Sequence, residues 1–349
     1  MPISTPPVLA RLVHCTVAAL LLPVATVVAA APAMSAHATT VSSRAVSDQE
    51  PGAARTAVRT SDTSGSIVFI KGRNVWIALG DGSHARKITK DGTKAHAYHS
   101  PSESDRGTIV VARGSKIIRM SQRGKVLNTI NPPRLFNSAG EALDGAVNDV
   151  AISPNGKTIA WSFVRYSCPI GADCLTRYAT GYTSATHRTH AGRSTYFRAA
   201  SWITNTRTLQ TGGYGSQVML QDLTKSPRHW FDDHDYTFPS TDLADGELSR
   251  NGRWLAEIRG FKGTSSIAWY AVSGDARTGR RPSMPLYTCV TNGEAAHASP
   301  TWSPKSTALA WAGKAGIWIK QDVASCSSPQ PTLVIRGGSA PDWSPARWK

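Results

Sequence analysis

One short phrase recurs along this chain. It consists of a small or polar residue, an apolar or aromatic residue, and then Ser-Pro or Ser followed by a turn. Copies occupy residues 98–101, 151–156, 247–252, 301–304 and 342–345, and a degenerate copy occupies 201–205. Counted at the first proline position, the copies fall at 101, 154, 204, 250, 304 and 345. These intervals are close to the length of one β-propeller blade, about 40 to 50 residues.

Strand-length apolar segments follow the copies of the phrase. Val, Ile, Trp and Tyr dominate segments such as 267–271 and 316–319, and these residues pack well on pleated sheets. Asn155-Gly156 and Asn251-Gly252 supply tight turns, because Asn and Gly tolerate positive φ. No segment shows sustained helical amphipathicity. The sequence therefore predicts an all-β domain over residues 65–349, a six-bladed β-propeller of four-stranded blades.

The two ends of this domain complement each other. Residues 66–70, 74–79 and 86–89 predict three strands with no phrase before them, whereas the phrase at 342–345 has no strands after it. Joined together, they make one complete blade whose innermost strand comes from the C-terminus. Closing the ring in this way removes exposed sheet edges. We therefore expect a seam between residues 66–89 and 341–345.

The first 38 residues resemble a secretory signal peptide. Arg11 is the only Lys, Arg, Asp or Glu before Thr39, and it precedes an apolar run that ends near Ala36-His37-Ala38. An uncleaved membrane anchor is the alternative, but Pro23 and the small residues at the end of the run favour cleavage. Residues 39–64 are rich in Ser, Thr, Ala and Arg and predict a disordered leader. The expected product is secreted and has no transmembrane span.

Four cysteines remain after cleavage at this position. An even number in an oxidising compartment indicates disulfides, and three pairings are open. Cys168 and Cys174 enclose a loop of five residues, and Cys289 and Cys326 then pair by elimination. Zinc binding is the competing interpretation, but the C-x₂-C and C-x₄-C spacings are absent.

The chain is strongly basic, with a formal net charge of +16. An anionic cell-envelope polymer would be attracted to such a protein, and the charge also promotes solubility. No run of five or six Lys or Arg residues occurs, so the sequence does not indicate specific recognition of nucleic acid.

The best copies of the phrase resemble a known family. Ile152-Ser-Pro-Asn-Gly-Lys-Thr-Ile-Ala-Trp161 and Trp302-Ser-Pro304 are similar to the WD40-like (PD40) repeat of TolB-type β-propellers. The resemblance extends over residues 65–349 and implies fold rather than function. TolB also has an α/β domain ahead of its propeller, and residues 39–64 are too few to form one. The resemblance therefore implies a stand-alone propeller.

Familiar catalytic motifs are absent, including G-x-S-x-G, H-E-x-x-H, Walker and G-x-G-x-x-G patterns. Any site would therefore be assembled from the loops that lead into the innermost strands. Counting back from the Trp position of each copy places ionisable or polar side chains at the channel mouth. These candidate ligand-binding residues are His96, Asn148, Asp149, Arg198, Asp245 and His297.

A metal site is a second candidate. The segment from His229 to Tyr236 contains His229, Asp232, Asp233, His234 and Asp235, which suit a divalent cation. It lacks the alternating order of a calcium loop, and a solvated loop explains it as well. No cofactor is predicted, although a divalent ion is the alternative.

The sequence favours a secreted, non-enzymatic protein that binds a protein, a peptide or a cell-envelope glycan. The alternative is a propeller lactonase, glycan lyase or cyclotransferase that uses His96, Asp149, Asp245 and His297.

Overall fold

The computed structural model describes residues 62–137, 139–168, 175–212, 217–232, 242–261, 264–278, 282–294 and 296–349. The chain consists of two units, residues 1–57 and 58–349. The predicted signal peptide and nearly all of the predicted leader lie outside the described residues. Among the described residues, no helical segment has the length and hydropathy that crossing a bilayer requires.

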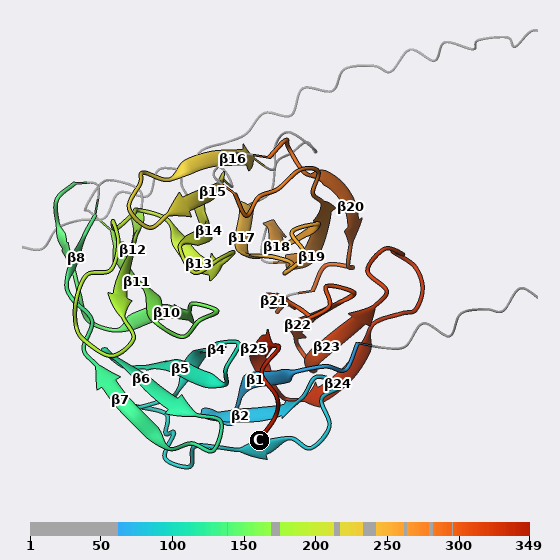
Figure 1. The fold of residues 1–349 in the computed structure, drawn as a ribbon, viewed down its shortest axis with the longest axis horizontal. Helices are drawn as coiled ribbons and strands as arrows, with labels where there is room; N and C mark the ends of the chain where they lie inside the picture. The colour runs from blue at the N-terminus through green and yellow to red at the C-terminus, as the bar shows by residue number, and fades with distance from the viewer. Residues whose placement is uncertain are drawn as a thin grey trace, which may run out of the picture. The chain divides into compact units, whose positions relative to one another are not determined.

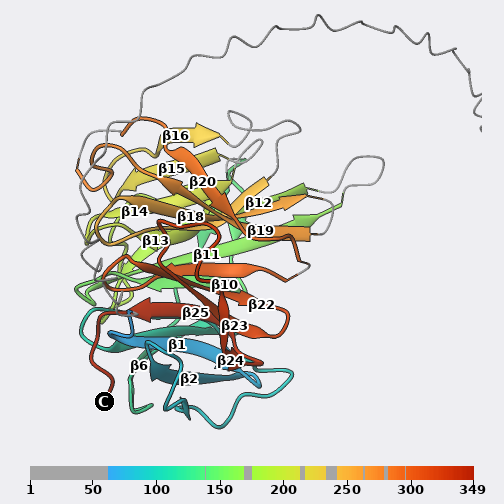
Figure 2. The same ribbon diagram turned by 90° about the vertical axis from the view of Figure 1, so that its right-hand side faces the viewer.

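Six antiparallel sheets surround a common centre (Figures 1 and 2). Blade 1 contains β25 (Ser339–Ser344), β1 (Ser66–Lys71), β2 (Asn74–Leu79) and β3 (Arg86–Lys87). Blade 2 contains β4 (His99–Glu103), β5 (Thr108–Arg113), β6 (Lys116–Ser121) and β7 (Val126–Ile130). Blade 3 contains β10 (Val147–Ile152), β11 (Thr158–Ser167) and β12 (Leu175–Ser184).

The second half of the ring repeats this plan. Blade 4 contains β13 (Arg198–Trp202), β14 (Arg207–Gly212), β15 (Gln217–Asp222) and β16 (Arg228–Asp232). Blade 5 contains β17 (Asp242–Leu248), β18 (Trp254–Phe261), β19 (Thr264–Ala271) and β20 (Leu286–Val290). Blade 6 contains β21 (Ala298–Trp302), β22 (Ala308–Gly313), β23 (Gly316–Gln321) and β24 (Thr332–Arg336). A small hairpin of β8 (Leu135–Phe136) and β9 (Ala142–Leu143) joins blades 2 and 3.

The predicted all-β, six-bladed propeller is confirmed, and so is its closure. Strand β25 pairs with β1 in antiparallel register, with Trp343 opposite Ile67 and Ser344 opposite Ser66. In blade 3 the described residues form three strands rather than four. The segment after β12 reaches that strand only through two isolated bridges, at His190 and Thr195.

The tryptophan of the repeated phrase joins neighbouring blades. Trp302 is fully buried between blades 5 and 6, and its Nε1 donates to the carbonyl of Glu247 in blade 5 at 2.8 Å. Trp202 makes the equivalent bond to the carbonyl of Ala151 at 3.0 Å. The indole buries a large apolar surface while its N–H remains bonded. This double requirement explains why Trp occupies the position in three of the six blades, at Trp202, Trp302 and Trp343.

The serine of the phrase organises the turn that follows. Ser303 Oγ accepts from the backbone N–H of Ala308 at 3.0 Å, and Ser153 Oγ accepts from that of Thr158 at 3.0 Å. A hydroxyl that bonds a nearby backbone N–H stabilises a tight turn. Gly156 completes such a turn with φ of 73°.

The first copy of the phrase was predicted in the wrong register. Glu103 pairs with Ile109 in blade 2 in the way that Trp302 pairs with Leu309 in blade 6. The repeat position of Trp is therefore occupied by Glu103, four residues after the predicted His99. The channel-mouth residue of blade 2 shifts by the same amount, from His96 to Ser100.

The predicted disulfide between Cys289 and Cys326 is present. It links β20 of blade 5 to the loop between β23 and β24 of blade 6. Cys168 is disulfide-bonded as well. Its predicted partner, Cys174, lies outside the described residues.

A largely buried ion pair within blade 4 is hydrogen-bonded to blade 5. Arg207 is 2% exposed and binds Asp222 with two bonds, from Nε to Oδ1 at 2.7 Å and from Nη2 to Oδ2 at 3.1 Å. Its Nη1 also donates to the carbonyl of Ala276 at 2.9 Å. The bonds from Arg207 hold the pKa of Asp222 below its ordinary value.

We expect Arg207→Met to lower the free energy of unfolding by about 3 kcal/mol, because it leaves the carbonyl of Ala276 without its donor and leaves Asp222 with only the longer ion pair to Arg228, at 3.4 Å. Urea unfolding of the purified protein measures the change. Arg134→Met is the matched control, since Arg134 forms an exposed ion pair with Asp144 at 3.0 Å. That control should cost under about 1 kcal/mol. Equal effects of the two substitutions would contradict the role of Arg207.

Candidate functional site

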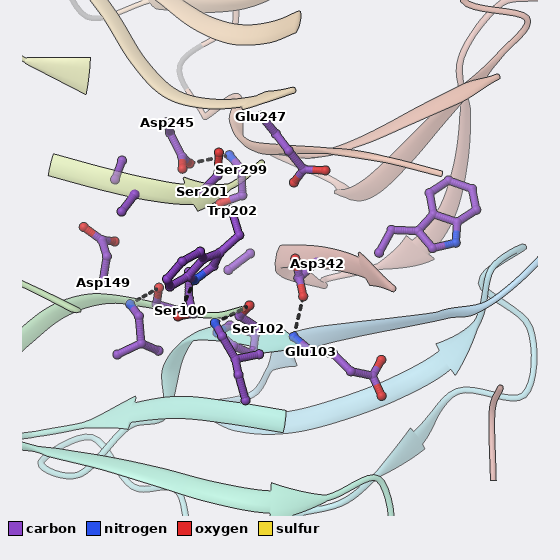
Figure 3. A pocket seen from close by; sticks show the side chains of 18 of the residues that line it. Ser100, Ser102, Glu103, Asp149, Ser201, Trp202, Asp245, Glu247, Ser299 and Asp342 are labelled. Carbon is purple, nitrogen blue, oxygen red and sulfur yellow. Dashed lines mark hydrogen bonds between the residues drawn. The ribbon is translucent and has the colours of Figure 1, made fainter. Parts of the chain in front are cut away.

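The centre of the ring contains a cavity of about 140 Å³. All six innermost strands contribute to its wall, and they are β4, β10, β13, β17, β21 and β25. Figure 3 shows Asp149, Asp245, Glu247 and Asp342 around this space, together with serine hydroxyls. The carboxylate of Glu103 points away from it (Figure 3).

Each innermost strand is interrupted by a β-bulge where it lines the cavity. Five residues at the equivalent position have a left-handed backbone, namely Ser100 (φ 48°), Ala199 (50°), Asp245 (49°), Ser299 (50°) and Ala340 (47°). None of them is glycine or asparagine, so each conformation costs about 1 kcal/mol or more. Strain that is repeated around one cavity indicates a position where function constrains the backbone.

Two carboxylates lie at the level of these bulges. Asp149 Oδ2 accepts from Ser162 Oγ at 3.0 Å and also from the side-chain amide of Asn148. Asp245 Oδ2 accepts from the backbone N–H of Ser299 at 2.9 Å. These bonds fix both carboxylates against the cavity wall and prepare them to accept hydrogen bonds from a ligand.

Two further carboxylates lie deeper and join adjacent blades. Glu247 Oε1 accepts from the backbone N–H of Trp302 at 3.0 Å. Asp342 Oδ2 accepts from the backbone N–H of Glu103 at 2.5 Å. Thr301 Oγ1 likewise accepts from the backbone N–H of Trp343 at 3.0 Å. Side chains at this position therefore form a belt of inter-blade hydrogen bonds, and Glu247 and Asp342 of this belt also line the cavity.

Burial raises the pKa values of three carboxyl groups that line the cavity. Burial raises the pKa of Asp245 to about 6, and the charge of Asp149 adds to the shift. Burial raises the pKa of Glu247 to about 8, with a further contribution from Asp342. Burial likewise raises the pKa of Asp342 to about 6. A cation in the cavity would replace the lost solvation and favour the ionised carboxylates.

An ion pair spans the opposite end of the cavity. Arg250 Nη2 lies 2.8 Å from Asp105 Oδ1, and the two residues belong to blades 5 and 2 on opposite sides of the ring. Arg250 is the one Lys or Arg among the described residues that line the cavity. A positively charged ligand would therefore enter from the end that carries Asp149 and Asp245.

The predicted channel-mouth residues are only partly brought together. Asp149 and Asp245 line the cavity, and the side-chain amide of Asn148 donates a hydrogen bond to Asp149. Arg198 stacks on Tyr178 at 5.0 Å, and its charge acts on Asp245. His96 is exposed on a loop outside the cavity wall.

His297 does not line the cavity either. It is buried beside β19, and its Nε2 lies 2.9 Å from Glu294 Oε1. The four-residue ring expected for a propeller enzyme is therefore not assembled around the cavity.

The predicted metal segment is only partly described. His229 Nε2 lies 3.1 Å from Asp232 Oδ1 at the end of β16, whereas Asp233, His234 and Asp235 fall outside the described residues. Over the part of the chain that the structure describes, no group of three or more His, Cys, Asp or Glu side chains is arranged to hold a metal ion.

Sequence reasoning missed Ser100, Glu247 and Asp342. Ser100 was missed because of the register error in blade 2. Glu247 and Asp342 occupy the position immediately before the Trp site, and alternation along a strand would have turned them toward the channel as well. Counting two residues forward from the channel-mouth position of each innermost strand would have identified both.

Comparison with known proteins supports the fold. No protein-family model matches the chain, and no curated protein matches it. A functionally unknown protein from Desulfotomaculum acetoxidans is 8% identical, with a TM-score of 0.51 over 81% of this chain and 100% of that one.

A structure provisionally assigned as TolB from Agrobacterium tumefaciens is 15% identical, with a TM-score of 0.49 over 82% of this chain and 95% of that one. A provisional 6-phosphogluconolactonase from Bacteroides fragilis is 10% identical, with a TM-score of 0.43 over 80% of this chain and 97% of that one. At these identities the likeness concerns architecture alone. The chain is a six-bladed β-propeller that is structurally similar to TolB and to other propellers.

Proposed function

We propose that this chain is a secreted, non-enzymatic binding propeller that recognises a protein or peptide partner by taking a positively charged side chain into its channel mouth. The observation that carries this proposal is the cluster of Asp149, Asp245, Glu247 and Asp342 around one cavity. The paired cysteines Cys289 and Cys326 support an oxidising, extracellular location.

The size of the cavity favours part of a partner over a whole small molecule. Its volume is about 140 Å³, whereas sites for drug-sized ligands measure roughly 300–1,000 Å³. The end of a Lys or Arg side chain fits a space of this size, and the rest of the partner would rest on the surrounding loops. Charged hydrogen bonds from an ammonium or guanidinium group to the carboxylates would hold it.

The net charge of the whole protein further limits which partners can bind. The chain has a formal net charge of +16, so a uniformly basic peptide would be repelled before it reached the acidic mouth. A neutral or acidic partner that projects one Lys or Arg is not repelled by the net positive charge of the protein, and its cationic side chain is attracted by the acidic channel mouth. This complementarity gives the site a means of selecting its partner.

Selection of random peptides on the immobilised protein is expected to enrich sequences with one central Lys or Arg. The double variant Asp149→Asn/Asp245→Asn should weaken their binding at least tenfold, because both acceptors lose their charge. Binding to the unaltered protein should weaken as the pH falls through about 6, since Asp245 then gains a proton.

Asp144→Asn is the matched control, because Asp144 is 58% exposed and pairs with Arg134 outside the cavity. Enriched peptides should bind this control as they bind the unaltered protein. Peptides without a common cationic residue, or equal binding to the double variant, would overturn the proposed function.

A further inference from the structure

A second cavity, of about 400 Å³, lies at the seam between blades 2 and 3. Its wall carries three cationic side chains, Arg106, Arg119 and Lys157, and three hydroxyl groups, Thr108, Ser184 and Thr186. Asn155 and Gly156 complete it, and no Asp or Glu is among the residues that form it. It shares no residue with the wall of the central channel.

The fold holds Arg119 in place at this seam. Arg119 is paired with Val110, a core residue of the blade 2–blade 3 interface, so both side chains face blade 3. Arg119 Nη1 donates to Asn128 Oδ1 at 3.3 Å, and Asn128 Nδ2 donates to the carbonyl of Ala185 at 3.1 Å. The guanidinium is thus oriented by Asn128, whose own side-chain amide is bonded across the seam.

One donor of this guanidinium is unused. Arg119 Nε is buried and has no hydrogen-bond partner among the described residues. A buried donor without a partner costs about 1–3 kcal/mol. A bound acceptor in the adjacent cavity would recover that loss.

The three cations also lack counter-ions. Across the described residues, no carboxylate lies within ion-pair distance of Arg106, Arg119 or Lys157. Asp105, the acid nearest to Arg106 in sequence, is engaged with Arg250 at 2.8 Å. The cavity therefore concentrates positive charge that no described part of the protein neutralises.

The opposite wall is held by backbone bonds. The backbone N–H of Ala185 donates to the carbonyl of Lys157 at 2.9 Å, and Asn155 Oδ1 accepts from the backbone N–H of Lys157 at 3.0 Å. Ser184 Oγ and Thr186 Oγ1 lie 3.2 Å apart at its rim. The turn that carries Lys157 is consequently fixed relative to the hydroxyl groups.

We propose that this seam cavity binds a phosphate group. Cations from two turns and a strand, together with several hydroxyl donors, surround one space, which suits a tetrahedral oxyanion better than the two coplanar oxygens of a carboxylate. A guanidinium fork matches phosphate oxygens in charge and geometry. The space exceeds a single phosphate, so the group would belong to a phosphate ester or a phosphodiester chain. This proposal is independent of the channel-mouth function.

Calorimetric titration of the purified protein with inorganic phosphate and with a synthetic glycerol-phosphate tetramer tests the proposal. We expect saturable binding of at least one probe. Tighter binding of inorganic phosphate would identify free phosphate as the ligand. Tighter binding of the tetramer would identify a phosphodiester group of a polymer. Arg119→Gln should weaken binding at least tenfold. Arg106→Gln, on the exposed rim of the cavity, should weaken it several-fold without affecting the fold.

Lys116→Gln is the charge-matched control, because Lys116 is exposed and lies in blade 2 outside this cavity. It should change affinity less than twofold. Thermal unfolding of each variant separates loss of binding from loss of fold. Absence of saturable binding to both probes, or equal weakening by Lys116→Gln and the two Arg variants, would overturn the proposal.

Discussion

Removal of residues 341–349 is expected to abolish cooperative folding of the propeller. The deletion removes Asp342, Trp343 and Ser344, which pair with β1 and close the ring. Trp343 is 2% exposed in the core between blades 1 and 6, and losing such a side chain alone costs about 3–5 kcal/mol. The exposed edge of β1 and the broken inter-blade belt add to this cost. Total stability of a domain is about 5–15 kcal/mol.

Far-ultraviolet circular dichroism during urea unfolding measures the outcome. The truncated chain should lack a sharp transition, whereas deletion of residues 347–349 alone should preserve one. That shorter deletion keeps β25 and loses the bond from the backbone N–H of Lys349 to Gln122 Oε1, at 2.8 Å. An unchanged midpoint in the longer deletion would show that the ring does not depend on this seam.

The propeller could be predicted from sequence because its repeated residues perform repeated physical tasks. Trp302 fills an inter-blade seam and bonds the preceding blade, and Ser303 folds the following turn. Both tasks require particular side chains, so both leave a pattern. The closure was predictable for a similar reason, since one end has an unmatched phrase and the other has unmatched strands.

The register of blade 2 was not predictable from the same pattern. The repeat contains two Ser-Pro pairs in its fullest copy, Ser299-Pro300 and Ser303-Pro304. Structural pairing shows that Ser100-Pro101 is equivalent to the first pair and not the second. Glu103 replaces the tryptophan that would have distinguished them.

Only some residues of the channel site could be predicted from the sequence. Asp149 and Asp245 followed from counting along the repeat, but the left-handed bulges leave no glycine or asparagine signal, because Ala199 and Ser299 adopt them as well. The seam cavity was not predictable at all. Arg106, Arg119 and Lys157 come from separate turns and strands, and only the packing of blades 2 and 3 brings them together.

Glu103 also sets an expected dependence of stability on pH. Its carboxylate accepts from Ser66 Oγ in blade 1 and from Gln122 Nε2 in blade 2, both at 2.7 Å. It therefore lies in the seam next to the closing strand β25. Burial raises its pKa to about 7 from an ordinary 4.5, and the charge of Asp342 adds to the shift.

The folded protein therefore holds this proton more tightly than the unfolded chain does. The stability that Glu103 contributes is complete below about pH 4.5 and is lost as the pH rises through about 7. The raised pKa values of Asp342 and Glu247 act in the same direction. The free energy of unfolding should consequently decrease between pH 5 and pH 8, and Glu103 alone accounts for about 3 kcal/mol of that decrease.

Glu103→Gln isolates this effect, because an amide offers a donor and an acceptor in the same place and cannot ionise. Urea unfolding at constant ionic strength should give nearly equal stability for the variant and the unaltered protein at pH 5. At pH 8 the variant should be the more stable by about 1–3 kcal/mol. Asp144→Asn, which neutralises an exposed carboxylate, should leave the pH profile unchanged. A variant that is less stable at pH 8 would show that the ionised carboxylate strengthens the seam, the reverse of what its burial predicts.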